Sequence, residues 1–165
     1  MVGTMSDMTI RAGRPDGYTS LTPFLVCSPA AEAIAYYEAV FGAKTVSRMD
    51  GPNGTVPHAE LDFGAGRLQL GDPSDEYGLH APERSDDRVS SSTCVYVADV
   101  DAVFAEALAR GATVREEPST FVTGDRFASV YDPFGHRWAI MTRVEDISPD
   151  ELARRLAEWA AQGAG

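Results

Sequence analysis

The chain is poor in cysteine and lacks the motifs of several large enzyme classes. Its 165 residues include only two cysteines, Cys27 and Cys94, with no CxxC spacing. Because each lies within an apolar run, we expect two buried free thiols rather than a disulfide or a zinc site. The sequence also has no GxxxxGK[ST] phosphate loop, no GxGxxG turn after a strand and no GxSxG nucleophile elbow. The usual signatures of nucleotide-driven chemistry and serine-type hydrolysis are therefore missing.

Positive charge is also scarce. There are 14 Lys and Arg residues against 25 Asp and Glu, which gives a formal net charge of -11. This balance opposes binding to nucleic-acid phosphates or to an anionic membrane surface. No apolar run approaches the roughly 18 residues of a membrane span, and the first residues lack the continuous apolar stretch of a signal peptide. We expect a cytoplasmic protein with neither a nucleic-acid nor a membrane partner.

The length suits one compact domain or two small halves that share a core. Residues 1–17 show no periodicity, so we expect a disordered N-terminus. The pattern then predicts a strand, a helix capped by Ser28 and ended by Gly42, and three short strands joined by glycine turns. A polar linker follows. The expected bounds are 20–27, 29–41, 44–49, 58–63 and 67–70 for the elements and 71–90 for the linker.

The same order of elements then returns. Gly42 and Gly111 are 69 positions apart, and so are Gly66 and Gly135, which indicates an internal duplication. We expect an α+β fold of two tandem βαβββ modules that form a curved mixed sheet with the helices outside and a concave, ligand-binding cleft inside. The modules cover about 19–70 and 91–142 of a domain that spans 18–146. In the second module, the elements are expected at 93–97, 99–110, 113–116, 126–131 and 137–142.

Residues 147–165 are predicted to form a C-terminal helix and tail. Ser148 can cap the helix and Pro149 suits its first turn, while Leu152, Leu156 and Trp159 follow at helical spacing. The apolar side of such a helix packs either on the core of its own subunit or against a second copy of the chain.

Two segments resemble a known family. The stretch AIAYYEAVFG that ends at Gly42 and the turn DPFGHRW at 132–138 resemble the vicinal oxygen chelate superfamily, which includes glyoxalases, bleomycin-resistance proteins and extradiol dioxygenases. The likeness runs from about 20 to 146. HAEL at 58–61, GDR at 124–126 and VEDISP at 144–149 resemble its PhnB-like branch. The resemblance implies a small organic ligand and a homodimer.

Metal-dependent members of that superfamily hold a divalent cation on four strands. The corresponding positions in this chain are Thr22, Gln69, Ser92 and Ala139, of which only Gln69 could ligate well. We therefore expect no metal site and no cofactor, and with them the metal-dependent glyoxalase and dioxygenase mechanisms are lost.

Alternation along the strand at 58–63 places His58, Glu60 and Asp62 on one face. A His beside a carboxylate can transfer protons near neutral pH, so His58 and Glu60 are the candidate catalytic residues. Cross-strand pairing or a dimer contact would explain the same pair. His136 fits a turn-building role in which Asp132 accepts backbone N–H groups, and His80 fits an exposed position.

A set of further residues is expected to contact a ligand. Arg126 could present its guanidinium to an anionic group, or it could form a salt bridge with a nearby acid. Phe121 could cover the opening of the cleft. The predicted ligand-binding residues are Thr22, Phe24, Gln69, Ser92, Tyr96, Phe121, Arg126 and Ala139.

Three hypotheses follow for the function. The first is a metal-free protein that binds or sequesters a small molecule. The second is an enzyme of lyase or isomerase type in which His58 and Glu60 transfer protons to a substrate oriented by Arg126 and Gln69. The third is an enzyme with a relocated metal on His58, Glu60 and Gln69.

Overall fold

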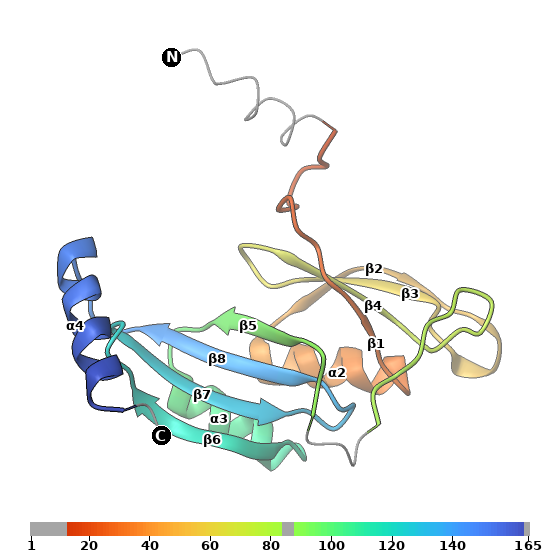
Figure 1. Cartoon of the computed structure of the whole chain (residues 1–165). Helices are drawn as coiled ribbons and strands as arrows, with labels where there is room; N and C mark the ends of the chain where they lie inside the picture. Colours follow the sequence, from red (N-terminus) through yellow and green to blue (C-terminus); the bar gives the residue numbers. More distant parts are fainter. Residues whose placement is uncertain (1–12, 84–87, 164–165) are drawn as a thin grey trace. The chain divides into compact units, whose positions relative to one another are not determined.

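The computed structural model describes residues 13–83 and 88–163. The chain divides into two compact units, residues 1–82 and 83–165 (Figure 1). Disorder is expected for residues 1–17, of which residues 1–12 lie outside the described residues, and it stays a prediction.

The first unit is a βαβββ module. Its sheet has the order β1-β4-β3-β2, in which β1 runs parallel to β4 and the other neighbours are antiparallel. A single 3-10 turn, Pro52–Gly54, lies between β2 and β3. The elements are β1 Phe24–Val26, α2 Ala30–Phe41, β2 Lys44–Met49, β3 His58–Asp62 and β4 Arg67–Gly71.

The second unit repeats this plan with the order β5-β8-β7-β6 and the same parallel pair at one edge. Phe24 lies beside Gln69 in the first unit, and Cys94 lies beside Ala139 in the second. The predicted duplication and the α+β class are confirmed, whereas one curved sheet with a shared cleft stays a prediction. The elements are β5 Ser92–Tyr96, α3 Val100–Ala109, β6 Thr113–Thr120, β7 Asp125–Tyr131 and β8 Arg137–Arg143.

In each sheet, the two central strands bury the apolar side chains of one face. In the first unit, Ala59 and Leu61 of β3 and Leu68 and Leu70 of β4 are almost wholly inaccessible to solvent. Their neighbours along the strands alternate with them and are only half-buried, as two-residue periodicity requires. The apolar side chains thus form the core and leave the opposite face of this sheet to polar groups.

The start of helix α2 differs from the prediction. The N-cap position belongs to Pro29 rather than Ser28, and the backbone N–H of Ala30 donates to Asp72 Oδ1 at 3.0 Å. Asp72 Oδ2 also accepts the N–H of Val56 at 2.7 Å. A carboxylate from the segment after β4 therefore satisfies the helix N-terminus, and a local sequence pattern cannot reveal this contact.

Two strand lengths also differ. The first strand is shorter than expected and begins only after Pro23, whose carbonyl accepts the N–H of Gln69 at 2.9 Å. Strand β6 is longer than expected and continues through Pro118 to Thr120. Because β6 is an edge strand with irregular register, it tolerates a residue without an N–H.

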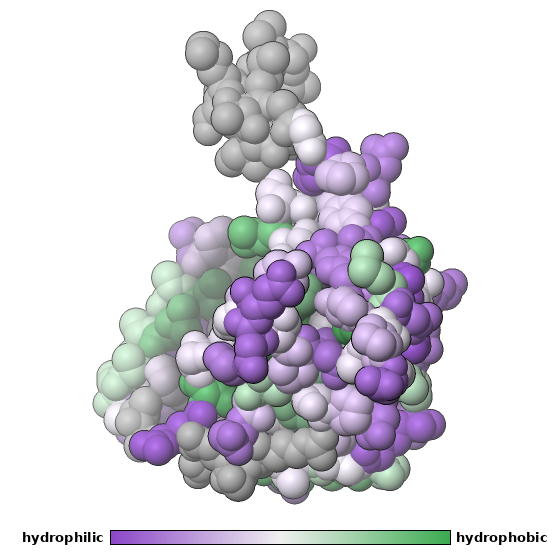
Figure 2. Space-filling view, turned by 90° about the vertical axis from the view of Figure 1, so that its right-hand side faces the viewer, coloured by the Kyte–Doolittle hydropathy of each residue, from purple (hydrophilic) through white to green (hydrophobic). Residues whose placement is uncertain are grey.

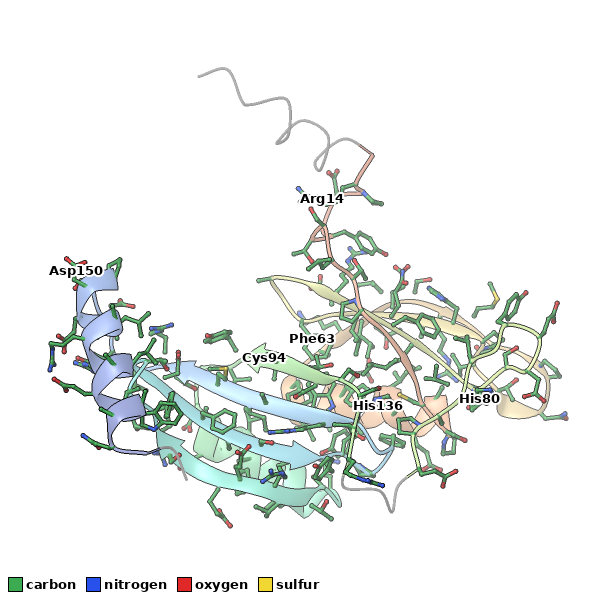
Figure 3. The ribbon with its side chains drawn as sticks, in the orientation of Figure 1. Arg14, Phe63, His80, Cys94, His136 and Asp150 are labelled. Atoms are coloured by element: carbon green, nitrogen blue, oxygen red, sulfur yellow. The ribbon has the colours of Figure 1, made fainter. Side chains whose placement is uncertain are left out.

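The cysteines are free, but only one is buried. Cys27 is fully inaccessible, with its Sγ 3.7 Å from the Tyr37 hydroxyl. Cys94 is exposed, which contradicts the prediction for this residue. Cys94 lies on β5, an edge strand (Figure 3). Residues 92 and 96 are exposed as well and share its face by strand alternation.

Helix α4 spans Pro149–Ala161, and Ser148 Oγ accepts the N–H of Glu151 at 3.2 Å, which confirms the predicted cap. The helix lies against its own unit, because the Trp159 ring meets Phe121 edge to face at 5.3 Å. Trp159 is nevertheless 39% exposed and Leu156 is 38% exposed. Across residues 13–83 and 88–163, every helix is too short or too polar to cross a bilayer.

Candidate functional site

A polar cluster lies on the half-buried face of the first sheet. Glu60 of β3 and Gln69 of β4 are direct cross-strand neighbours, and His58 lies two residues before Glu60 on the same face. The predicted alternation of β3 is therefore confirmed: His58 and Glu60 share the face opposite the apolar core. The roles proposed for these side chains stay predictions.

Glu60 is the centre of this cluster. Its Oε1 accepts a hydrogen bond from Gln69 Nε2 at 3.1 Å and lies 3.4 Å from His58 Nε2. Its Oε2 accepts a hydrogen bond from the Tyr18 hydroxyl and lies 3.8 Å from Arg67 Nη1. Four side chains from three segments of the chain thus converge on one carboxylate.

The hydrogen bonds hold the pKa of Glu60 below its ordinary value of 4.5. The largest contribution is the bond from Tyr18, while those from His58 and Gln69 act in the same direction and partial desolvation opposes them. Glu60 is consequently an anion at neutral pH and a weak base. It is better suited to orient donor groups than to take up a proton.

An aromatic side chain borders the cluster. The Phe24 ring lies 5.9 Å from the His58 ring at a tilted angle, and both side chains are about one-third exposed. Four of the predicted site residues, Phe24, His58, Glu60 and Gln69, are therefore brought together on one sheet face. Thr22 precedes strand β1 and is half-buried.

Sequence reasoning missed two members of the cluster. Arg67 places its guanidinium carbon 4.4 Å from the centre of the Tyr18 ring, a cation–π geometry. Tyr18 stands at the border of a stretch without periodicity, so no local pattern marks it. A chain that reaches back over the sheet can be recognised only once the strands are placed.

The corresponding face of the second sheet carries different chemistry. Ser129 of β7 lies opposite Ala139 of β8, at the places that Glu60 and Gln69 hold in the first sheet. Arg137 donates to Ser129 Oγ at 3.2 Å and to a Glu116 carboxylate oxygen at 3.1 Å. The second face therefore lacks an amide and a carboxylate at these two positions.

The remaining predicted residues belong to the second unit. Ser92 and Tyr96 are exposed on β5. Phe121 lies in the loop before β7 and packs against Trp159 of α4. Arg126 donates twice to the Asp101 carboxylate of α3, at 2.5 and 2.6 Å. Its guanidinium is thus held in the salt bridge that the sequence offered as the alternative to ligand binding.

The other two histidines, His80 and His136, lie on other segments of the chain (Figure 3). His80 is exposed in the segment after β4, as expected. His136 lies in the turn between β7 and β8, where Asp132 Oδ1 accepts the N–H groups of Phe134 and His136, both at 2.9 Å. The turn-building interpretation of this motif is confirmed.

The donor groups do not fit the family's metal. Ala139 has no lone pair, and Thr22 and Ser92 offer only neutral hydroxyl groups, so Gln69 alone of the four corresponding positions carries a good donor. Among the residues that the structure describes, no three His, Cys, Asp or Glu side chains are arranged to hold a metal ion. In the view of Figure 2, hydrophobic residues gather toward the left and hydrophilic residues dominate the right.

Comparisons with known proteins place the chain in a family. It is 34% identical over 148 residues to an uncharacterised protein of Mycobacterium bovis, an alignment that covers 88% of this chain and 95% of the other. The crystal structure of TioX from Micromonospora sp. ML1 is similar with a TM-score of 0.59 and 25% identity, covering 74% of this chain and 97% of that one.

A PhnB protein from Bacillus cereus, a putative 3-demethylubiquinone-9 3-methyltransferase, shares the fold with a TM-score of 0.58 and 20% identity, over 75% of this chain and 99% of that one. It is one structural neighbour among several. The sequence profile of the Glyoxalase/Bleomycin resistance protein/Dioxygenase superfamily matches residues 20–140. The chain belongs to the Glyoxalase/Bleomycin resistance protein/Dioxygenase superfamily.

Proposed function

We propose that this protein binds a small organic molecule on the polar face of the first sheet, without using the metal of its family. The observation that carries the proposal is the convergence of His58, Gln69, Arg67 and Tyr18 on Glu60. Buried or half-buried polar groups beside an aromatic ring are the usual means by which a protein orients a small ligand. The side chains at the family's metal positions favour direct contacts between protein and ligand, without a metal ion between them.

Solution NMR tests this proposal. A library of small organic molecules is titrated into the wild-type protein while the backbone amide resonances are followed. Ligands are expected to shift the amides of β3 and β4, and Glu60→Gln should weaken their binding about tenfold or more, because a hydrogen bond to a charged group is worth about 1.5–3 kcal/mol.

Glu32→Gln is the matched control, since Glu32 has the same charge but is exposed on helix α2. It should leave the affinities unchanged. Shifts confined to other elements, or an equal loss in both variants, would contradict the proposal.

A second candidate function is proton transfer at a bound substrate. It is favoured by the placement of His58 Nε2 3.4 Å from Glu60 Oε1 and by the one-third exposure of the His58 side chain, which a substrate could reach. Glu60 would orient the imidazole, and His58 would move the proton. His58→Ala should then abolish turnover of the substrate while its affinity falls only a few-fold.

A third candidate is an enzyme with a divalent metal relocated to His58, Glu60 and Gln69, which elemental analysis of protein purified without chelator would detect. We further propose a homodimer, supported by the exposed apolar side of α4 at Leu156 and Trp159. Light scattering at micromolar concentration tests it.

Membership of the PhnB-like branch is likewise a proposal, supported by the shared fold of the Bacillus cereus protein.

A further inference from the structure

The segment that precedes the first strand crosses the polar face and is anchored there by one side chain. Within residues 13–20, only Tyr18 is half-buried, while its neighbours are all exposed. The described backbone hydrogen bonds of this segment include a local one, from Tyr18 N–H to the Pro15 carbonyl. A segment held by so few contacts opens at low cost in free energy.

Tyr18 meets the cluster as a bound phenol would. Its hydroxyl donates to Glu60 Oε2, and its ring lies under the Arg67 guanidinium at 4.4 Å. Gly17 allows this close approach: its φ of +82° suits glycine, and a Cβ there would come within 2.7 Å of an Arg67 nitrogen. The carboxylate fixes the hydroxyl, and the guanidinium fixes the ring plane.

We propose that Tyr18 occupies the place of the ligand, and that the ligand is a planar aromatic molecule with a hydroxyl group that displaces Tyr18. This inference rests on the proposed function, because it assigns a chemical class and a built-in competitor to the same face. Glu60 accepts the ligand hydroxyl, and Arg67 stacks on its ring. The N-terminal segment is then a strap that leaves when the ligand enters.

The covalent link between Tyr18 and the rest of the chain determines how strongly it competes with a free ligand. A side chain linked by a short flexible segment competes at an effective concentration in the millimolar range. The apparent affinity of a free ligand falls by the fraction of molecules in which the strap is open. Removing the Tyr18 side chain should therefore strengthen binding of a phenol without adding any contact to it.

The test uses p-cresol, which has the shape of the tyrosine side chain, and toluene, which differs from it by the missing hydroxyl. Both are titrated by NMR into the wild-type protein and the variants Tyr18→Ala, Tyr18→Phe and Tyr77→Ala. Tyr77 is the matched control, because it is 74% exposed in the segment after β4. Circular dichroism verifies that each variant is folded.

We expect Tyr18→Ala to bind p-cresol about tenfold or more tightly than the wild type, with Tyr18→Phe between them and Tyr77→Ala unchanged. Toluene should gain less than p-cresol. Adding Glu60→Gln to Tyr18→Ala should weaken p-cresol about tenfold and change toluene less than about twofold. In the wild-type protein, saturating p-cresol should shift the Tyr18 ring resonances to those of a solvent-exposed tyrosine.

Equal p-cresol affinity in the wild type and both Tyr18 variants would overturn the inference, as would equal gains for toluene and p-cresol. If the library yields ligands of β3 and β4 that are indifferent to Tyr18 and lack an aromatic hydroxyl, the proposed function stands and this inference fails. If no molecule shifts those strands in any variant, both fail.

Discussion

Asp132 supports the turn of the second module more strongly than any exposed acid can. Its carboxylate is 5% exposed and accepts three hydrogen bonds, from the N–H groups of Phe134 and His136 at 2.9 Å and from Trp138 Nε1 at 2.8 Å. Trp138 is 1% exposed, so water reaches its indole nitrogen poorly. The substitution Asp132→Ala removes all three acceptor contacts.

The expected loss is about 3–5 kcal/mol in the free energy of unfolding. A hydrogen bond to a charged group contributes about 1.5–3 kcal/mol net of the exchange with water, and leaving the buried indole N–H without this acceptor costs about 1–3 kcal/mol. The two turn N–H groups regain part of their loss from water. Asp132→Asn should cost less, about 2–3 kcal/mol, because its remaining oxygen still accepts from the turn while its amide faces Trp138 Nε1.

Urea unfolding measures both values. Circular dichroism reports the whole chain, and Trp fluorescence in a Trp159→Phe background reports Trp138 alone, since the chain has two tryptophans. Asp62→Ala is the control in the matching turn of the first module, where the side chain accepts one N–H from Gly64 in an exposed setting. It should cost less than about 1 kcal/mol. A loss below about 1 kcal/mol for Asp132→Ala would refute the reasoning.

Three further predictions concern the fold and the cluster. Asp72→Ala should lower the free energy of unfolding by about 2–4 kcal/mol in urea titrations, since two N–H groups, one at the start of α2, lose a charged acceptor. Gly124→Ala should cost about 2–4 kcal/mol by the same measurement, because φ is +83° and a Cβ would lie 2.4 Å from the Glu145 carbonyl oxygen. Because the pKa of Glu60 is lowered in the folded state, its stabilising contribution is present above pH 4.5 and is lost as the pH falls through the folded-state pKa. The melting temperature of the wild type should therefore fall more steeply toward low pH than that of Glu60→Gln.

Local patterns predicted most of the fold because they report local physics. Helix α2 ends at Gly42 with φ +67°, a left-handed conformation that glycine adopts without strain. The cap at Ser148 and the turn at Asp132 likewise depend on residues a few positions apart. The prediction that Ser28 caps helix α2 was wrong, because the N–H at the start of the helix bonds to Asp72, which is 44 positions away from Ser28 in the chain.

The candidate site was predictable only in part for the same reason. Strand alternation placed His58 and Glu60 on one face, and the resemblance to metal-dependent family members singled out Gln69. Neither signal could reveal that Tyr18 reaches Glu60, because an isolated aromatic residue has no period. Whether Arg126 forms a salt bridge with Asp101 or contacts a ligand depends on the distance between β7 and α3, which sequence spacing does not give.

The two modules show how a repeated fold can specialise. Leu70 and Ile140 occupy matching buried positions and keep the same packing role, whereas Glu60 and Ser129, which also match, differ in charge and reach. Once a gene segment is copied, the helix-facing side of each copy stays constrained by its own stability, and the other side can drift independently. Ser129 is itself fully buried and accepts a hydrogen bond from Arg137, so a larger side chain at this position of the second copy would have to displace its neighbours.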